Sequence, residues 1–403
     1  MAGALVPRRP WRGRRVVLGI TGGVAAYKAA QLARDLTQLG AAVDVVLTPA
    51  AQEFIGALTL EALTGRPVRG ALLAPGQALE HIRLAREADA VCVAPATADF
   101  LARAAAGRAD DLLGAVLLAT RAPVLVCPAM NDRMWAHPQT QANVARLRDV
   151  LGYAVVGPAV GPLAYGEGEG PGRLEEPEVI AEHVGRALEG ETPYRGRKVV
   201  VTAGPTREPV DPVRFVSNRS SGRMGFALAA AAWRRGADVV LVAGPTAVAP
   251  PPGPQLVRVT TAAEMERAVR EALPGAAALI MAAAVADFRP ARPAPRKIKK
   301  EEAPREIPLE PAPDVLRATR AAWPPGLVVV GFALETEAGL ENARRKLEEK
   351  GLDLAVLNEA TAPDAGFEVE TNRVVLLDRE GGVETVPLLP KDEVAEIILD
   401  RIA

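Results

Sequence analysis

Three lysines lie within four residues of this chain, at Lys297, Lys299 and Lys300. The sequence holds only eight lysines against 40 arginines, so this cluster departs from the composition of the rest of the chain. Lys346 and Lys350 are spaced i,i+4 in ENARRKLEEKG and share one face of a predicted helix. Lysine is a compact cation on a flexible stem, which suits it to binding phosphate groups from a loop. On its own, KIKK followed by two glutamates is also typical of a solvated surface loop.

Amide, carboxylate and hydroxyl side chains follow several apolar runs. Asn131 comes after PVLVCPAM, where its amide can hydrogen-bond a carboxylate or cap the next helix. Asp287 comes after AAAVA, where it can contact a nucleotide or a metal ion or, again, cap a helix. Asn218 precedes SSGRMG, which should open a helix whose N–H groups can bind phosphate, although a serine N-cap is as common there.

Two segments of the first half could also bind a ligand. GITGGVAAYK places Gly22 and Gly23 between an apolar run and a helix. Such a turn cradles a phosphate in some proteins and is only a tight connection in others. His81, in LEHIRLA, is one of three histidines, and a lone histidine is more often structural than catalytic. Convergence of several such segments at one sheet edge is a stronger signal than any of them alone.

The elements that must position these residues follow one pattern in both halves. Residues 14–48 and 196–244 each contain an apolar run, a turn or loop, an amphipathic helix and a second apolar run. Apolar strands that alternate with helices predict parallel sheets covered on both faces. We predict an α/β protein of two doubly wound, Rossmann-like or flavodoxin-like parallel-sheet domains, residues 1–190 and 191–403. Ligands are expected at the carboxyl ends of the strands, and the proline-rich residues 288–306 are expected to form a loop.

Composition narrows the class of protein. The net charge of -1 disfavours a role in binding nucleic acid or a membrane surface through bulk charge. No apolar run approaches the ~18 residues that span a bilayer, and the basic N-terminus lacks a signal-peptide core. Cys92 and Cys127 lie in apolar runs typical of buried thiols in a reducing compartment. The sequence therefore predicts a soluble cytoplasmic protein.

The motifs of both halves, and the order in which they follow one another, support a family resemblance. TGGVAAYK, LEHIRLA, APAT, ADDLL and PAMNDRMW, in this order, resemble the flavin-dependent cysteine decarboxylases. FVSNRSSGRMG, AAAVADFRP, KIKK, APD and GFALET resemble phosphopantothenate–cysteine ligases. Their fusion resembles the bacterial bifunctional proteins of coenzyme A biosynthesis from about residue 14 to residue 400.

This resemblance implies an FMN-dependent decarboxylase in the first domain. In the family the thiol of 4′-phosphopantothenoylcysteine is oxidised by the flavin, CO2 leaves, and the electrons are returned without net redox change. His81 would be the active-site histidine, and Asn131 would hold the substrate carboxylate. The residues that would line FMN are Gly22, Gly23, Val24, Thr48, Thr97, Ala98, Asp99, Phe100 and Ala129.

The first domain departs from the family at its flexible clamp. The family carries a cysteine there, whereas GPLAYGEGEGPGR here has Tyr165 at that place. A phenol, with a pKa near ~10, is a weaker acid than a thiol near ~8.5. Tyr165 could donate the proton instead, the reduction could be slow, or the reaction could stop before it. We favour a retained decarboxylase, and the alternative is a ligase with an inactive flavin-binding scaffold. Asp99 is a milder departure, since an amide is common there.

In the second domain the resemblance implies a ligase that activates a carboxylate with CTP and Mg2+ before cysteine attacks. Lys297 would be the lid lysine, Asn218 would stabilise the acyl-cytidylate, and Asp287 would contact cytidine or the metal ion. The remaining residues of the implied nucleotide site are Met281, Ala282, Ala283, Pro313, Asp314, Val315, Leu316, Phe332, Lys346 and Lys350. Phe332 could equally be core, and chemistry alone leaves CTP and ATP open.

The expected partners are small molecules and copies of the same chain. The resemblance implies 4′-phosphopantothenate, cysteine and CTP as substrates, together with trimeric contacts of the decarboxylase domain and dimeric contacts of the ligase domain. An NAD-type oxidoreductase is disfavoured, because neither GITGGVAAYK nor TAGPTREP matches a spaced GxGxxG fingerprint.

Overall fold

The computed structural model describes residues 10–73, 78–190, 192–299, 306–335, 339–359 and 369–403. Contacts between residues divide the chain at Gly190 into an N-terminal unit and a C-terminal unit. Both units are α/β, which confirms the predicted fold class. Within the described residues, no helix is both long and apolar enough to cross a membrane.

The N-terminal unit is built on a parallel five-stranded sheet in the order β2-β1-β3-β4-β5. Its strands are β1 (Arg15–Ile20), β2 (Ala42–Leu47), β3 (Ala90–Ala96), β4 (Val124–Pro128) and β5 (Ala154–Val155). This is the flavodoxin-like order. The direction in which successive strands are added to the sheet reverses between β1 and β3, which is the switch point of this fold. Every residue of β3 is buried, as expected for a strand covered on both faces.

Helices cover both faces of this sheet. One face buries α1 (Ala26–Gln38), α2 (Ala57–Thr64) and α8 (Pro177–Glu189). The other buries α3 (Glu80–Glu87), α4 (Ala98–Ala105), α5 (Leu112–Ala119) and α7 (Pro138–Ala145). Shorter elements are the 3-10 turn at Pro49–Glu53, α6 (Asp132–Ala136), the π turn at Arg146–Val150, and the hairpin of β6 (Ala159–Pro162) and β7 (Glu169–Arg173).

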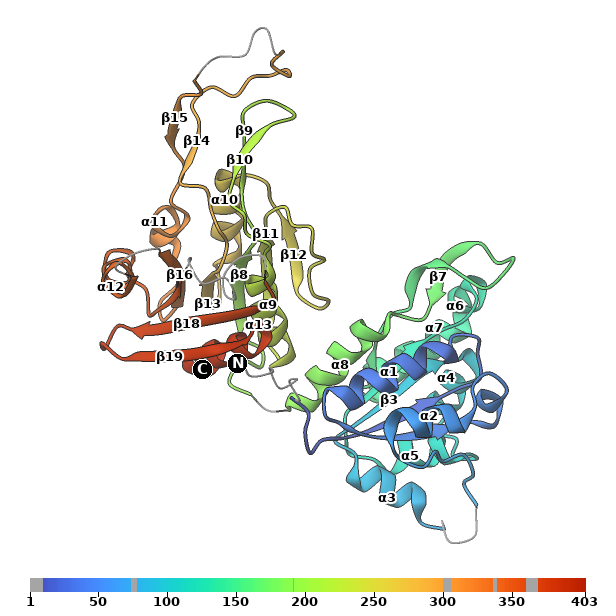
Figure 1. Ribbon diagram of the computed structural model, residues 1–403. Coiled ribbons are helices and arrows are strands. Elements are labelled where there is room, and N and C mark those ends of the chain that lie inside the picture. The colour runs from blue at the N-terminus through green and yellow to red at the C-terminus, as the bar shows by residue number, and fades with distance from the viewer. Residues whose placement is uncertain (1–9, 74–77, 191, 300–305, 336–338, 360–368) are drawn as a thin grey trace. The chain divides into compact units, whose positions relative to one another are not determined.

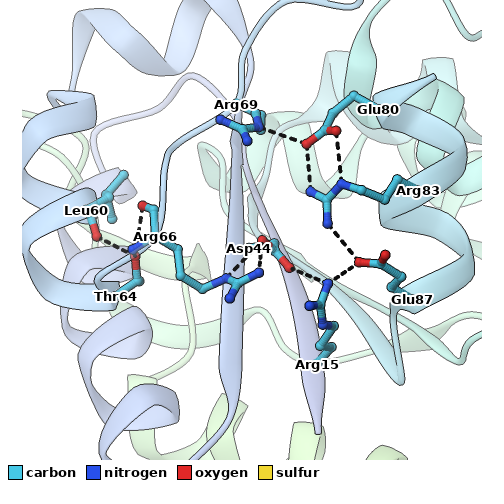
Figure 2. Close-up of polar contacts among 9 residues, drawn as sticks. All are labelled: Arg15, Asp44, Leu60, Thr64, Arg66, Arg69, Glu80, Arg83 and Glu87. Carbon is cyan, nitrogen blue, oxygen red and sulfur yellow. Dashed lines mark hydrogen bonds and ion pairs between the residues drawn. The ribbon is translucent and has the colours of Figure 1, made fainter. Parts of the chain in front are cut away.

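A charged network fastens α3 to the sheet (Figure 2). Glu80, 9% exposed, accepts hydrogen bonds from Arg83 in its own helix and from Arg69 after α2. Arg83 also pairs with Glu87 at 2.7 Å. Arg15 on β1 pairs with Glu87 in turn, so the network joins the helix to a central strand. The hydrogen bond from Arg83, against the effect of burial, lowers the pKa of Glu80 to about 2.

The Glu80→Gln variant is expected to lose about 2 kcal/mol of unfolding free energy at pH 7. Because the folded-state pKa of Glu80 lies below its unfolded value, this stabilisation is complete above about pH 5 and disappears as the pH falls toward 2. Urea unfolding followed by circular dichroism at pH 7 and pH 3 measures it. Exposed Glu53, changed to glutamine, is the control. Equal losses at both pH values would contradict the assignment.

The C-terminal unit is built on an eight-stranded sheet in the order β12-β11-β8-β13-β16-β17-β18-β19. Its parallel strands are β8 (Lys198–Ala203), β11 (Asp238–Ala243), β12 (Gln255–Arg258), β13 (Ala276–Met281), β16 (Val328–Glu335) and β17 (Leu354–Glu359). These six follow the Rossmann order, with the switch point between β8 and β13. β18 (Thr371–Asp378) and β19 (Val383–Pro390) add an antiparallel edge to the predicted parallel sheet. A hairpin can extend an open parallel sheet without a crossover helix.

Two groups of helices cover the C-terminal sheet. α9 (Arg223–Arg234) and α13 (Lys391–Arg401) pack together on one face. α10 (Ala262–Ala272), α11 (Val315–Thr319) and α12 (Gly339–Lys350) cover the other, and a 3-10 turn at Arg320–Ala322 follows α11. Gly225 is needed because a Cβ there would lie 2.7 Å from the carbonyl oxygen of Thr202, where α9 crosses β8.

The proline-rich segment contains more structure than predicted. β14 (Phe288–Pro290) pairs with β15 (Leu309–Pro311), and this ribbon contacts the hairpin of β9 (Arg207–Pro209) and β10 (Phe215–Ser217), as Figure 1 shows. The prediction of a loop throughout residues 288–306 was therefore wrong for its first residues. A two-stranded ribbon has outward edges that need no hydrogen-bond donor, so it accommodates proline.

Candidate active sites

A cavity of about 850 Å3 lies at the carboxyl ends of β1 to β4 in the N-terminal unit. Turns that follow four different strands line it, as the switch-point rule for open parallel sheets requires. Of the residues expected to line a flavin, the cavity contains Gly22, Gly23, Val24, Thr48, Thr97, Ala98, Asp99 and Ala129. Asn131 lines it as well.

The wall after β1 and β3 is built from glycine and threonine. A Cβ on Gly22 would lie 2.4 Å from the Cβ of Ala50, so only glycine allows this turn to approach the segment after β2. The Thr21 hydroxyl donates to the Pro95 carbonyl at 2.8 Å and accepts from the Thr97 N–H at 3.0 Å, which joins the ends of β1 and β3. Among the described residues, no side chain caps the first turn of α1, and its Ala26 and Lys28 N–H groups donate to the carbonyl oxygens of Gly23 and Ala25. The volume and the uncapped helix start fit a flat cofactor that carries a phosphate.

Asn131 serves both functions that the sequence left open. It is the N-cap of α6, and its Oδ1 accepts a hydrogen bond from the Arg133 N–H at 2.9 Å. This bond occupies the oxygen of the amide, so the Nδ2 group, which can only donate, is left for a ligand in the cavity. A cap and a carboxylate-binding donor are therefore compatible in one side chain.

Three expected residues do not line this cavity. Phe100 is 1% exposed and packs into the core between α4 and its neighbours, because it points from the inner face of that helix. Tyr165 is exposed at the tip of the β6–β7 hairpin, where the bond from the Leu163 N–H to Gly168 closes the turn. His81 lies on α3, and its Nδ1 is a buried atom without a hydrogen-bond partner among the described residues.

A cluster of acidic and basic side chains at this cavity was not predicted from the sequence. Arg103 lines the cavity and pairs with Asp111 at 2.6 Å, Asp110 at 3.5 Å and Asp99 at 3.0 Å. The charge of Asp99, unusual for the resemblance, is therefore balanced by a helix neighbour. The motif ADDLL, which contains both of the other aspartates, was the available signal.

The second cavity, of about 380 Å3, lies in the C-terminal unit at the ends of β13, β16 and β17. It is lined by all but one of the residues expected at a nucleotide site: Asn218, Met281, Ala282, Ala283, Asp287, Pro313, Asp314, Val315, Leu316, Phe332, Lys346 and Lys350. Residues of β13, α11, β16 and α12 and of the loops beside them thus meet at one sheet edge.

Hydrogen bonds hold several of these side chains. Lys350 pairs with Asp314 at 3.0 Å, and Lys346 donates to the Phe332 carbonyl. Burial would raise the pKa of Asp314, but the hydrogen bonds from Lys350 and from the Arg317 N–H lower it below its ordinary value. The carboxylate is therefore ionised at neutral pH, and it fixes one of the two lysines at the cavity.

Asn218 joins two loops of the C-terminal cavity. Its Nδ2 donates to the carbonyl oxygens of Ala284 and Val285, each at 3.1 Å. The bonds tie the segment before α9 to the end of β13. For the Asn218 Nδ2 group to donate to a bound acyl group, it must give up its hydrogen bond to one of these two carbonyl oxygens.

Lys297 is the expected residue that does not line this cavity. It is exposed, as is Lys299, whereas Lys300 lies outside the described residues. The next residue is anchored instead: the Ile298 N–H donates to buried Asp211 at 3.2 Å, and Arg214 donates to the Ile298 carbonyl. The β9–β10 hairpin, which sequence patterns did not reveal, therefore determines where this loop rests.

Among the described residues, no group of three or more His, Cys, Asp or Glu could hold a metal ion. Asp287 and Asp314 line the C-terminal cavity, and Mg2+ is commonly bound by one or two carboxylates together with substrate phosphates. The donor set fits Mg2+ that arrives with a nucleotide.

Comparisons with known proteins cover both units. The model of the DNA/pantothenate metabolism flavoprotein C-terminal domain matches residues 194–403, and the Flavoprotein model matches residues 6–188. The coenzyme A biosynthesis bifunctional protein CoaBC of Mycolicibacterium smegmatis is 47% identical, and the match covers 97% of this chain and 97% of that protein. Its counterpart from Escherichia coli K12 is 43% identical over the same shares. A crystal structure of the C-terminal domain of a CoaBC protein is 38% identical, with a TM-score of 0.44, covering 52% of this chain and 94% of that one.

Proposed function

The chain belongs to the family of bifunctional coenzyme A biosynthesis proteins, and from that premise we propose how its residues divide two reactions between two cavities. It is a phosphopantothenoylcysteine decarboxylase and a phosphopantothenate–cysteine ligase. Its N-terminal unit, residues 1–190 in our proposal, is an FMN flavoprotein and carries the decarboxylase. Residues 191–403 carry the ligase.

In the N-terminal cavity the protein binds and orients the substrate. When bound, FMN supplies the two-electron oxidation and reduction that surround loss of CO2. The Gly22–Val24 turn and the uncapped start of α1 hold the phosphate of the cofactor. The Asn131 Nδ2 group donates to the substrate carboxylate, while its oxygen remains on the Arg133 N–H. When the substrate carboxylate leaves as CO2, the charge-assisted hydrogen bond from the Asn131 Nδ2 group is lost.

Tyr165 and His81 complete the proposed decarboxylase site. The β6–β7 loop already reaches the cavity through Leu163 and Ala164, so Tyr165, which lies beside them, can serve as proton donor once the tip turns inward. The alternative of an inactive flavin scaffold is not favoured, because the bifunctional relatives match along both halves. His81 lies outside the cavity of its own chain. We therefore assign it to the site of a neighbouring copy in a homo-oligomer.

The proposed assembly uses trimeric contacts of the decarboxylase unit and dimeric contacts of the ligase unit. The buried free thiols Cys92 and Cys127 fit a reducing compartment, so we place the enzyme in the cytoplasm.

In the C-terminal cavity the ligase activates 4′-phosphopantothenate with CTP. The substrate carboxylate attacks the α-phosphorus of CTP, which gives the acyl-cytidylate and pyrophosphate. The amine of cysteine then attacks the acyl carbon, and CMP leaves with the electron pair of the broken C–O bond. Lys346 and Lys350 bind the triphosphate, Asp287 holds cytidine or Mg2+, and Asn218 and Lys297 act on the acyl-cytidylate.

One observation carries the ligase proposal: cations, carboxylates and amides from segments far apart in the chain meet in one cavity at the switch point of a Rossmann-ordered sheet. The full chain with phosphopantothenate, cysteine, Mg2+ and CTP should release pyrophosphate and then CO2. ATP in place of CTP should support at least about tenfold less pyrophosphate release, because a site fitted to one base loses hydrogen bonds with another. Release of pyrophosphate without CO2 would contradict the decarboxylase activity. Equal rates of pyrophosphate release with ATP and CTP would contradict the assignment of CTP as the nucleotide.

A further inference from the structure

Two cations of the C-terminal cavity have no part in the reaction as described above. Lys391, the first residue of α13, lines the cavity although only 5% of its surface is exposed. Its ammonium group donates to the Val369 carbonyl. Arg223, the first residue of α9, also lines the cavity and pairs with the exposed carboxylate of Glu370. The starts of two packed helices thus bring two cations to one end of the cavity.

The sheet separates this end from the two proposed triphosphate lysines. α9 and α13 pack on one face, whereas α12, which carries Lys346 and Lys350, packs on the opposite face. The cavity crosses the carboxyl edge between them, because residues of both faces line it. A ligand that spans the cavity therefore meets a pair of cations on either side.

Neutral donors complete the α9 and α13 end. Asn372 is fully buried, lines the cavity and donates to the Asn358 Oδ1 at 3.3 Å. Gly222, the N-cap of α9, has φ +79°, and no side chain caps the first turn of this helix. The positive end of the helix dipole adds to the charges of Arg223 and Lys391. Two cations, an amide pair and a helix N-terminus match the needs of a tetrahedral oxyanion.

The charge balance of the cavity points the same way. Its lining contains four cations, Arg223, Lys346, Lys350 and Lys391, and two carboxylates, Asp287 and Asp314. The excess of positive charge favours a ligand with more than one negative group.

The surroundings of Lys391 make its charge sensitive to a ligand. Burial, and next the charge of Arg223 on α9, lower the pKa of Lys391 to about 8, while Glu370 before β18 opposes the shift. Asp392 and Glu393 are the other charged groups in the first turn of α13. An anion bound beside the ammonium group favours its protonated form, so binding and protonation are linked.

We propose that Lys391 and Arg223 form a second phosphoryl-binding subsite of the ligase cavity, on the face of the sheet opposite Lys346 and Lys350. This inference rests on the ligase function proposed above. In that reaction a phosphoryl group has two sources, the terminal phosphates of the nucleotide and the phosphate of 4′-phosphopantothenate.

Steady-state kinetics of the full chain test the subsite. At pH 7, Lys391→Met should raise KM by about 10- to 100-fold, the effect of losing a charge-assisted contact, while kcat changes less. If the subsite takes the nucleotide, KM for CTP and the inhibition constant of pyrophosphate both rise. If it takes 4′-phosphopantothenate, only the KM of that substrate rises. Unchanged values for both substrates would overturn the proposal.

The pH profile separates ligand binding from a structural role of Lys391. In the parent, KM for the phosphoryl substrate should rise by up to about tenfold per pH unit above pH 8, as Lys391 loses its charge. Lys391→Arg keeps a permanent charge and should flatten this profile. A profile that rises equally in Lys391→Arg and the parent would contradict the assignment. Should Lys391→Met fail to fold, Lys391→Arg alone decides the question.

Lys198 offers a matched control. It also donates to a backbone carbonyl, that of Pro274 at 3.1 Å, but it begins β8 and so lies at the opposite edge of the sheet from the cavity. Lys198→Met should leave every KM unchanged. A parent that forms no amide would count against the proposed ligase. Calorimetric binding of pyrophosphate and of 4′-phosphopantothenate, compared between the parent and Lys391→Met, would still decide the subsite.

Discussion

Replacing Lys297 by glutamine is expected to slow amide formation by at least about 100-fold while pyrophosphate release in the first turnover persists. Lys297 is proposed to act on the acyl-cytidylate, where negative charge develops as cysteine attacks. Removal of one positioned donor or charge from such a transition state costs about 10²–10³ in rate. Glutamine keeps the length and polarity of the side chain and removes its charge.

A rapid-quench experiment separates the two steps of the Lys297→Gln variant. Pyrophosphate and phosphopantothenoylcysteine are measured in the same samples, and the variant should accumulate the first without the second. Lys299→Gln is the control, because Lys299 is equally exposed on the same loop. An equal loss of both products in Lys297→Gln would refute the proposed role.

The structure explains why this lysine depends on loop position. The backbone of Ile298 is bonded to Asp211 and Arg214 at the β9–β10 hairpin, and Lys297 beside it stays exposed outside the cavity. The loop must leave or pivot on these bonds before its ammonium group can reach a bound intermediate. The proposed role of Lys297 therefore adds to amide formation a conformational step that pyrophosphate release would not require.

Changing Asn131 to aspartate should abolish decarboxylation, with a loss of at least about 100-fold in CO2 release. The Nδ2 donor proposed for the substrate carboxylate becomes a second carboxylate, so attraction is replaced by repulsion. Aspartate is as good an N-cap as asparagine, so its oxygen keeps the bond to the Arg133 N–H and α6 stays intact. The change therefore tests chemistry with little effect on folding.

Release of labelled CO2 from carboxyl-labelled phosphopantothenoylcysteine measures this effect. The flavin absorbance of the same preparation reports that the N-terminal unit is folded, and its ligase activity reports that the C-terminal unit is folded. Asn143→Asp is the control, since Asn143 accepts a hydrogen bond from Gln139 on α7 and does not line the cavity. Undiminished CO2 release from Asn131→Asp would remove Asn131 from the site.

Asn131 and Asp314 each combine a structural role with a place in a cavity. A helix cap uses the oxygen of Asn131, and a charge pair uses the carboxylate of Asp314, yet both residues line cavities. The structural role fixes the orientation of the polar group before a ligand arrives. Such pre-organisation lowers the cost of binding.

Local sequence determined the building blocks of this protein. Apolar runs such as AVCVAPA became buried strands, and the amphipathic segments between them became helices, because periodicity is a property of neighbouring residues. Gly22 and the polar residues after each strand also predicted that ligands bind at one edge of each sheet. In a parallel sheet all carboxyl ends of the strands lie on that edge. The fold class and the turns that line both cavities followed from these patterns.

Only the tertiary structure decided which side chains reach a cavity. Phe100 turned into the core, Tyr165 and Lys297 stayed exposed, and His81 lies outside the cavity of its own chain. The antiparallel pair β18 and β19 and the cations Arg223 and Lys391 were not predicted either. Several of these outcomes depend on contacts between residues far apart in the chain, such as the bond from Ile298 to Asp211. Local patterns specify how a segment folds, whereas the packing of distant segments against each other determines where its side chains point.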